Sequence, residues 1–136
     1  SAMYEEKGKF YLFVKSSPNP DNLLLLVSDH VNGKFERVEG FDDSMGAQTK
    51  GMYEAPTAVK LADGRWCLFA DFYGAGCAGQ GYVPFVSDDL TKGVFTRADE
   101  AFHFPYGFKH GTILPITEEE YERMLARDWT DVPDLR

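Results

Sequence analysis

The sequence lacks a basic excess and lacks any long apolar run, and both absences exclude classes of protein. Its 14 Lys and Arg stand against 22 Asp and Glu, for a formal net charge of −8. Nucleic-acid binding needs clustered Lys and Arg that replace the counterions of the phosphates, so no nucleic-acid partner is expected. No purely apolar run is longer than that of residues 23–27, which is far short of the ~18 residues that cross a bilayer. We therefore expect no membrane partner either.

Cysteine is also scarce. Cys67 and Cys77 are the only two, and they form neither a disulfide framework nor a Cys-x-x-Cys metal pair. We interpret them as free thiols, the alternative being a disulfide that closes the short segment between them. The N-terminus has no secretory signal, which makes the cytoplasm the default expectation for localisation.

What is present indicates one globular domain. Hydrophobic residues make up 43% of the 136 residues and aromatic residues 15%, enough apolar material for a packed core. Residues 1–2, ahead of Met3, resemble the remnant of a tag. We expect the domain to occupy residues 3–127 and an irregular tail to occupy residues 128–136.

The chain repeats itself, with three matches in the same order. Each repeat predicts short β-strands that are separated by Gly, Pro, Asn and Asp turns. The first match recurs after 56 residues, and the matched segments are 8–14 with 64–70, 27–30 with 86–89, and 33–37 with 93–97. The predicted strands are 9–15, 23–28 and 35–38 in the first unit, 56–61, 65–71, 82–87 and 94–98 in the second, and 112–116 as the start of a third. Four consecutive antiparallel strands are one blade of a β-propeller.

Two elements carry more specific expectations. The strand 23–28 begins with four leucines and a valine, which predicts burial on both of its faces. At the other end of the chain, Thr117 and Glu120 match a capping box. Tyr121, Met124 and Leu125 then provide an apolar stripe, so we predict one C-terminal helix that closes the fold.

The repeat also predicts a site. The 56-residue offset maps Glu54 onto His110, and each precedes the first predicted strand of its blade. First strands line the channel of a propeller, so this carboxylate and imidazole are expected to converge. The alternatives are a surface carboxylate at a strand end for Glu54 and a hydrogen-bonded core histidine for His110.

A glycine-rich segment over residues 71–81 is a second candidate. It has neither the Lys-Ser/Thr ending nor the following helix of a phosphate loop. Phe72 and Tyr73 are candidates for stacking on a sugar, and Asp71 and Gln80 for hydrogen bonds to sugar hydroxyls. The alternative is a flexible loop that connects two strands of a blade.

Four segments carry a resemblance to a known family: Tyr-Glu-Ala-Pro at 53–56, Gly-Tyr-Val-Pro-Phe-Val-Ser-Asp-Asp-Leu at 81–90, Lys-His-Gly-Thr at 109–112, and Leu-Pro-Ile-Thr-Glu-Glu-Glu-Tyr at 114–121. Together they resemble the C-terminal half of a glycoside hydrolase of family 43. The resemblance implies an all-β, five-bladed propeller, of which this chain would hold about two to three blades and one C-terminal helix.

The resemblance also implies a function. Family 43 includes inverting β-xylosidases, α-L-arabinofuranosidases and arabinanases, so the expected partner is a glycan that contains xylose or arabinose. Glu54 matches the general acid, although Ala55 stands where Gly is commoner. His110 matches a histidine that often lies beside a hydrated cation such as Ca²⁺, and no other cofactor is required.

The general base and the Asp that tunes the acid belong to earlier blades of that family, and neither has a counterpart here. We therefore expect the isolated chain to be inactive. Half a ring exposes apolar faces and strand edges, which predicts a homodimer or assembly with a complementary N-terminal half. The alternative function is a non-catalytic carbohydrate-binding module or a structural remnant of the family.

Overall fold

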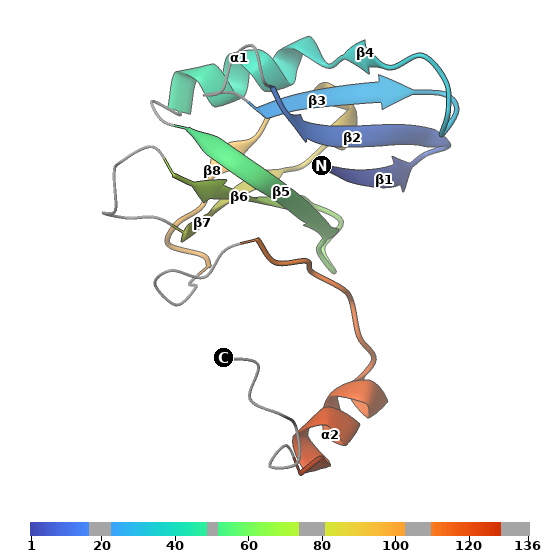
Figure 1. Ribbon diagram of the computed structural model, residues 1–136, viewed down its shortest axis with the longest axis vertical. Helices are drawn as coiled ribbons and strands as arrows, with labels where there is room; N and C mark the ends of the chain where they lie inside the picture. The colour runs from blue at the N-terminus through green and yellow to red at the C-terminus, as the bar shows by residue number, and fades with distance from the viewer. Residues whose placement is uncertain (17–22, 49–51, 74–80, 103–109, 129–136) are drawn as a thin grey trace.

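The computed structural model describes residues 1–16, 23–48, 52–73, 81–102 and 110–128. Their main body is two antiparallel four-stranded sheets, in each of which every strand pairs with the one before it in the chain (Figure 1). The first sheet contains β1 (Ala2–Glu6), β2 (Lys9–Lys15), β3 (Leu23–Ser28) and β4 (Glu36–Arg37). The second contains β5 (Tyr53–Lys60), β6 (Trp66–Phe72), β7 (Gly81–Ser87) and β8 (Thr96–Arg97). The predicted all-β class with blade-like sheets is confirmed.

The repeat is visible in the turns as well as in the strands. Ser28 Oγ accepts a hydrogen bond from the backbone N–H of His30 at 3.2 Å, and Ser87 Oγ accepts one from that of Asp89 at 3.3 Å. The two Ser-Asp motifs of the sequence therefore make the same turn after β3 and after β7. A short 3₁₀ helix, Leu90–Lys92, follows the second of these turns.

Three elements differ from the sequence prediction. β1 was not predicted, and Ala2 belongs to it, so the first blade begins within the residues that resemble a tag. Helix α1 (Glu39–Gln48) was not predicted either, and it buries Phe41 and Met45. The predicted strand 112–116 is wrong, because these residues are assigned to no strand. No second strand of a third blade is found in the described part of the chain to pair with it.

The C-terminal helix is confirmed. Helix α2 (Glu118–Ala126) has Thr117 as its N-cap, and both hydrogen bonds of the capping box are present. None of its residues is buried, and Figure 1 shows residues 110–128 leading away from the sheets. The helix therefore does not close the fold as expected. Neither α1 nor α2 has the length and apolar character that a membrane-spanning helix requires.

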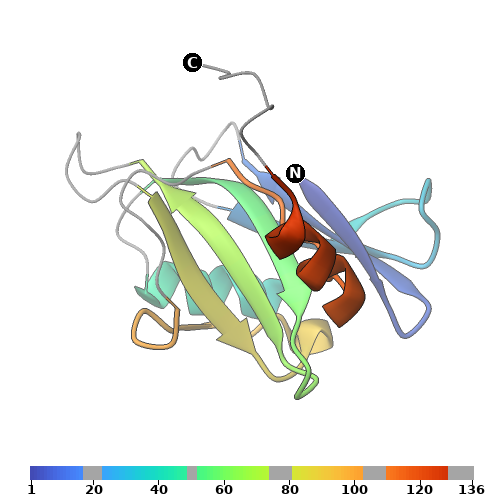
Figure 2. The same ribbon diagram turned by 90° about the horizontal axis from the view of Figure 1, so that it is seen from below.

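The main core lies between the two sheets. Phe13 is fully buried there, with its ring edge-on to Phe41 of α1 and to Phe95 at 5.8 and 5.9 Å between centroids. The second sheet contributes Trp66, Leu68 and Ala70 to this core. Helix α1 lies beside β3 (Figure 1), and in the view of Figure 2 the strands of the second sheet pass in front of this helix.

Alternate residues of β6 point to opposite faces of the second sheet. Trp66 and Leu68 point toward the first sheet, whereas Cys67 and Phe69 form a second cluster on the opposite face of the second sheet. This alternation follows from the two-residue period of a strand. The expected burial of 23–28 on both faces is wrong for one face: Leu23 and Leu25 are buried, while their neighbours on β3 remain part-exposed.

Candidate active site

Glu54 sits where the second sheet is irregular. It pairs across the ladder with Asp71 of β6, and the register shifts between Glu54 and Thr57. Ala55, inside this shift, has a φ of 45°, a left-handed conformation that favours glycine. A bulge of this kind bends the strand and re-aims its side chains. The strained alanine thus stands at the position where the resemblance expects glycine.

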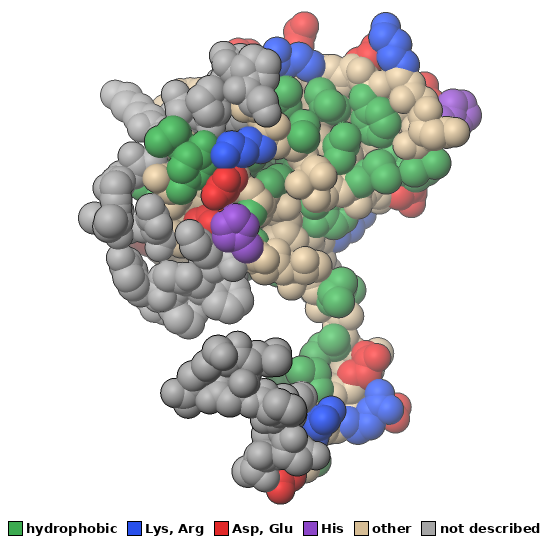
Figure 3. Space-filling model, viewed as in Figure 1, with side chains coloured by type: hydrophobic (Ala, Val, Ile, Leu, Met, Phe, Trp, Pro, Cys, Tyr) green, Lys and Arg blue, Asp and Glu red, His purple; other side chains and the backbone are tan. Residues whose placement is uncertain are grey.

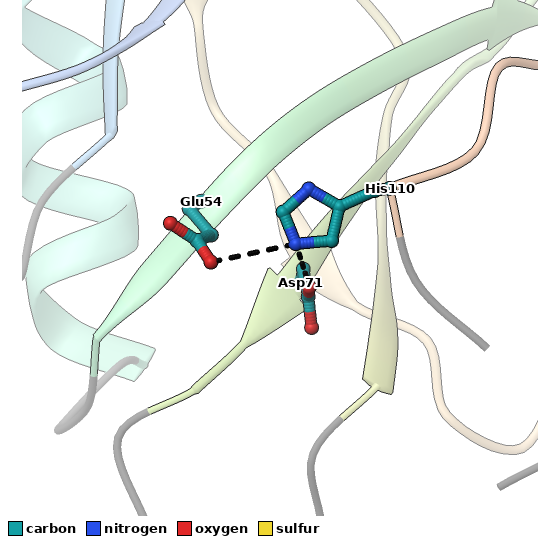
Figure 4. A group of neighbouring side chains, drawn as sticks. All are labelled: Glu54, Asp71 and His110. Carbon is teal, nitrogen blue, oxygen red and sulfur yellow. Dashed lines mark ion pairs between the residues drawn. The ribbon is translucent and has the colours of Figure 1, made fainter. Parts of the chain in front are cut away.

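His110 closes on Glu54 and Asp71 from a separate segment (Figure 4). Its Nε2 lies 3.2 Å from Asp71 Oδ2 and 3.6 Å from Glu54 Oε1. The Asp71 side chain is fully buried, that of Glu54 is 25% exposed and that of His110 is 54% exposed. The predicted convergence of Glu54 and His110 is confirmed, although their chemical roles stay predictions.

Tyr82 links the backbone at Ala55 to the backbone at Gly111, the residue after His110. Its hydroxyl donates to the carbonyl oxygen of Gly111 at 2.8 Å, and it lies 3.3 Å from the carbonyl oxygen of Ala55. Burial raises the pKa of Tyr82 above its ordinary value, which extends the pH range over which the phenol keeps its proton and donates. His110 itself has a φ of 57°. One buried side chain therefore holds together the two segments that carry Glu54 and His110.

Lys15 is a site residue that the sequence analysis missed. Its Nζ lies 2.9 Å from Glu54 Oε2 and 4.3 Å from the centroid of the Tyr73 ring. The pKa of Lys15 is raised, first by the hydrogen bond to Glu54 and next by that to Tyr73. Lys15 and Asp71 are 56 residues apart, so they are equivalent positions of the repeat. The offset that linked Glu54 to His110 would have found Lys15 had it been applied backward from Asp71.

The other predicted contact residues have mixed placements. Asp71 belongs to the cluster with Glu54 and His110, and Tyr73 faces Lys15. Phe72 packs against Tyr53 at a centroid distance of 5.2 Å and borders the main core. Gln80 lies outside the described residues. A cavity of about 350 Å³ adjoins the cluster, with a lining that includes Tyr4, Ala55, Pro56, Thr57, His110, Gly111 and Thr112.

The cluster could hold a small cation. One donor atom from each of Glu54, Asp71 and His110 lies within 4.8 Å of the others. Tetrahedral Zn²⁺ with bonds of ~2.0–2.2 Å separates its donors by about 3.3 Å, close to the observed histidine–carboxylate distances. Ca²⁺ prefers six to eight oxygen ligands, so this mixed nitrogen and oxygen set suits it less well. The Lys15 ammonium already supplies one positive charge at Glu54.

Side chains of lysine, acidic and histidine type gather on one face of the molecule (Figure 3). Strands of two blade-like sheets supply the Glu54 and Asp71 carboxylates and the Lys15 ammonium, and the segment that begins at His110 supplies an imidazole. Together they define a β-blade domain with a candidate acid–base site. The sequence model of a family related to glycoside hydrolase family 43, described as "Probable glycosyl hydrolase domain", matches residues 1–122. The chain belongs to this family of glycosyl hydrolase domains. No curated protein and no solved structure matches the chain significantly.

Proposed function

We propose that the chain forms part of a glycosidase that hydrolyses xylose- or arabinose-containing glycans with inversion, and that Glu54 is its general acid. The observation that carries the proposal is the bulge, which aims a carboxylate of 25% exposure at a site it shares with His110 and buried Asp71. A general acid must reach the leaving oxygen while staying partly shielded from water. The membership of the chain in a glycosyl hydrolase family supports the same chemistry.

The general base must come from beyond this cluster. Inverting glycosidases hold their two carboxyl groups ~6.5–9.5 Å apart, so that a water molecule fits opposite the acid. Oxygen atoms of Glu54 and Asp71 lie within 4.8 Å of each other, and Asp71 is fully buried. Asp71 therefore does not fit the role of base. A complementary half of the ring is the expected source of the missing carboxylate.

One observation favours the alternative, a non-catalytic carbohydrate-binding module or a structural remnant. The Lys15 ammonium lies 2.9 Å from Glu54, and a neighbouring positive charge favours the ionised carboxylate. An acid catalyst must instead carry a proton. For the enzyme reading, Lys15 must move away from Glu54 when substrate binds or when the missing part of the ring is added.

The test is hydrolysis of aryl β-xylosides and aryl α-L-arabinofuranosides by the chain alone, by the chain joined to a polypeptide that carries the missing blades, and by the joined Glu54→Gln variant. We expect almost no turnover by the chain alone and turnover by the joined protein. Glu54→Gln should reduce the rate ~10²–10⁴-fold for poor leaving groups and much less for activated aryl groups, which need no proton. Robust turnover by the chain alone would show that it already contains its base. A joined protein that binds the sugar without hydrolysing it would favour the binding module.

A further inference from the structure

The first sheet has an apolar face that none of the other described strands or helices covers. We call it the outer face, and it comprises Met3, Phe10, Leu12, Val14, Leu24 and Leu26. The register places Met3, Leu12 and Leu26 in one row and Val14 beside Leu24 in the next. Met3 is 43% exposed and the other members are part-exposed. Figure 3 shows hydrophobic side chains gathered over β1–β3.

A second apolar surface lies on residues 111–117, which we call the arm. Ile113 packs against the far cluster of the second sheet, around Cys67 and Phe69. Leu114 and Ile116 point away from it, and they are 74% and 49% exposed. The alternation of part-buried and exposed residues over 111–114 is that of an extended β-type segment. The arm thus offers apolar side chains with no sheet to cover them among the described residues.

The repeat indicates what the outer face is shaped to receive. Phe10, Leu12 and Val14 are the equivalents of Trp66, Leu68 and Ala70, 56 residues later. In the second sheet those three residues are buried beneath the β-structure of the preceding blade. The outer face is therefore the same kind of surface without its cover, and extended chain with apolar side chains is the cover that fits it.

One copy of the chain cannot bring its two open surfaces together. The outer face lies on the side of the first sheet that is turned away from the second sheet, and the arm lies on the far side of the second sheet. The two sheets stand between them. A second copy placed head to tail, however, presents its arm to the outer face of the first, and contacts of this kind close into a ring when the rotation allows.

We infer that two copies of this chain assemble head to tail, with Leu114 and Ile116 of each arm packed on the outer face of the other copy's first sheet. Because the arm begins next to His110, the contact also fixes the segment that carries this residue. The inference does not depend on glycosidase activity, since it concerns assembly alone. A complementary half of the ring would compete for the same outer face.

The experiment measures mass by light scattering and sedimentation from 1 to 100 μM, concentrations at which specific pairs of this size commonly form. We expect twice the 15.3 kDa of one chain. Leu114→Lys and Leu12→Lys should each weaken the dimer on the order of 100-fold, because each buries an unpaired ammonium. Val94→Lys is the matched control: Val94 is 54% exposed and belongs to neither surface, so the dimer should be unchanged.

Mixing the two disrupted variants separates this arrangement from others. In a mixture, the intact arm of Leu12→Lys meets the intact outer face of Leu114→Lys, so mixed dimers should form where neither variant dimerises alone. Leu114 is so exposed that its substitution leaves the monomer folded, which keeps the test valid if Leu12→Lys misfolds. A chain that stays at 15.3 kDa, or a dimer that Leu114→Lys does not weaken, would overturn the inference. Displacement of the second copy only by a complementary half would show that the outer face belongs to that partner.

Discussion

The two sheets come from one repeat, yet they differ where the candidate site lies. β1 pairs with β2 in continuous register from Ala2 to Glu6, while the equivalent ladder of the second sheet is broken between Glu54 and Thr57. At the equivalent ends of β2 and β6 stand Lys15 and Asp71, of opposite charge. The first sheet thus supplies an ammonium, and the second supplies two carboxylates. The bulge at Ala55 and the opposite charges of Lys15 and Asp71 are thus the differences between the two sheets at the candidate site.

The sheets also differ in how they are buried. β6 is buried at six consecutive residues, from Trp66 to Asp71, whereas β2 alternates between buried and part-exposed residues. Both strands have nearly the same apolar pattern, so the pattern alone does not decide burial. What decides it is whether a neighbouring layer is present on each side.

The largest effect is expected in the core between the sheets. Phe13→Ala should lower the free energy of unfolding by about 3–5 kcal/mol, because it empties a fully buried site. Phe10→Ala, on the same strand but on the outer face, should cost about 1 kcal/mol in the monomer. Urea unfolding at low protein concentration measures both. Equal losses would contradict the assignment of one inner and one outer face.

The next effect concerns Cys67, the repeat equivalent of Tyr11. Burial raises the pKa of Cys67 to about 12 and also raises that of Tyr11. In a Cys77→Ser background, labelling of Cys67 by a disulfide reagent at pH 8 should be at least ~100-fold slower in the folded chain than in urea. Below pH 9 the thiol is protonated in both the folded and the unfolded chain, so the free energy of unfolding does not depend on it. Between pH 9 and 12 only the unfolded chain ionises readily, so the free energy of unfolding falls as the pH rises. Rapid labelling of the folded chain would place Cys67 at the surface.

Alanine substitutions at two glycines with positive φ, Gly64 and Gly93, distinguish the cost of backbone strain from the cost of steric crowding. A Cβ at Gly93 would lie 2.6 Å from Val38 Cγ1, but one at Gly64 would meet nothing within 4 Å. Gly93→Ala should therefore cost about 2–3 kcal/mol, and Gly64→Ala about 1 kcal/mol from backbone strain alone. Thermal unfolding of both variants tests the difference. A cheaper change at Gly93 than at Gly64 would contradict the packing of α1 against this turn.

The smallest effect on stability is expected at the ion pairs. Lys15→Met should lower stability by about 0.5 kcal/mol, because its pair with Glu54 is only partly shielded from water. The equivalent change at Lys9, whose pair with Asp29 is exposed, should have no measurable effect. Adding Glu54→Gln to Lys15→Met should cost less than the two single changes together. Strict additivity would mean that Lys15 and Glu54 do not interact in solution.

The sequence predicted the strands best where the repeat supplied a second copy of the pattern. β1 was missed because it is short, has Tyr4 as its only aromatic residue and ends in two glutamates. Helix α1 was missed because Gly40 and Gly46 interrupt it, and Phe41 and Met45 anchor it by tertiary packing instead.

The repeat also explains why the sequence predicted that Glu54 and His110 lie close together. Glu54 and His110 share an offset, and the offset reflects positions on a common fold. Asp71 was expected to contact sugar, because nothing in its local sequence shows that the bulge at Ala55 brings it beside His110. The alternating 111–117 segment has the signal of a strand, but it lacks a partner strand in the described chain.

The central claim is that two repeats build one site around His110. The most direct measurement is the ¹⁵N and ¹H chemical shifts of the His110 ring in the wild-type chain and in Glu54→Gln, Asp71→Asn and Lys15→Met. The account predicts that Asp71→Asn shifts the Nε2 resonance most, since Asp71 lies 3.2 Å away, and that Glu54→Gln, at 3.6 Å, shifts it next. Lys15→Met should give a smaller shift through Glu54, and His30, on an exposed turn, should not respond. A His110 ring that none of the three changes affects would contradict the account.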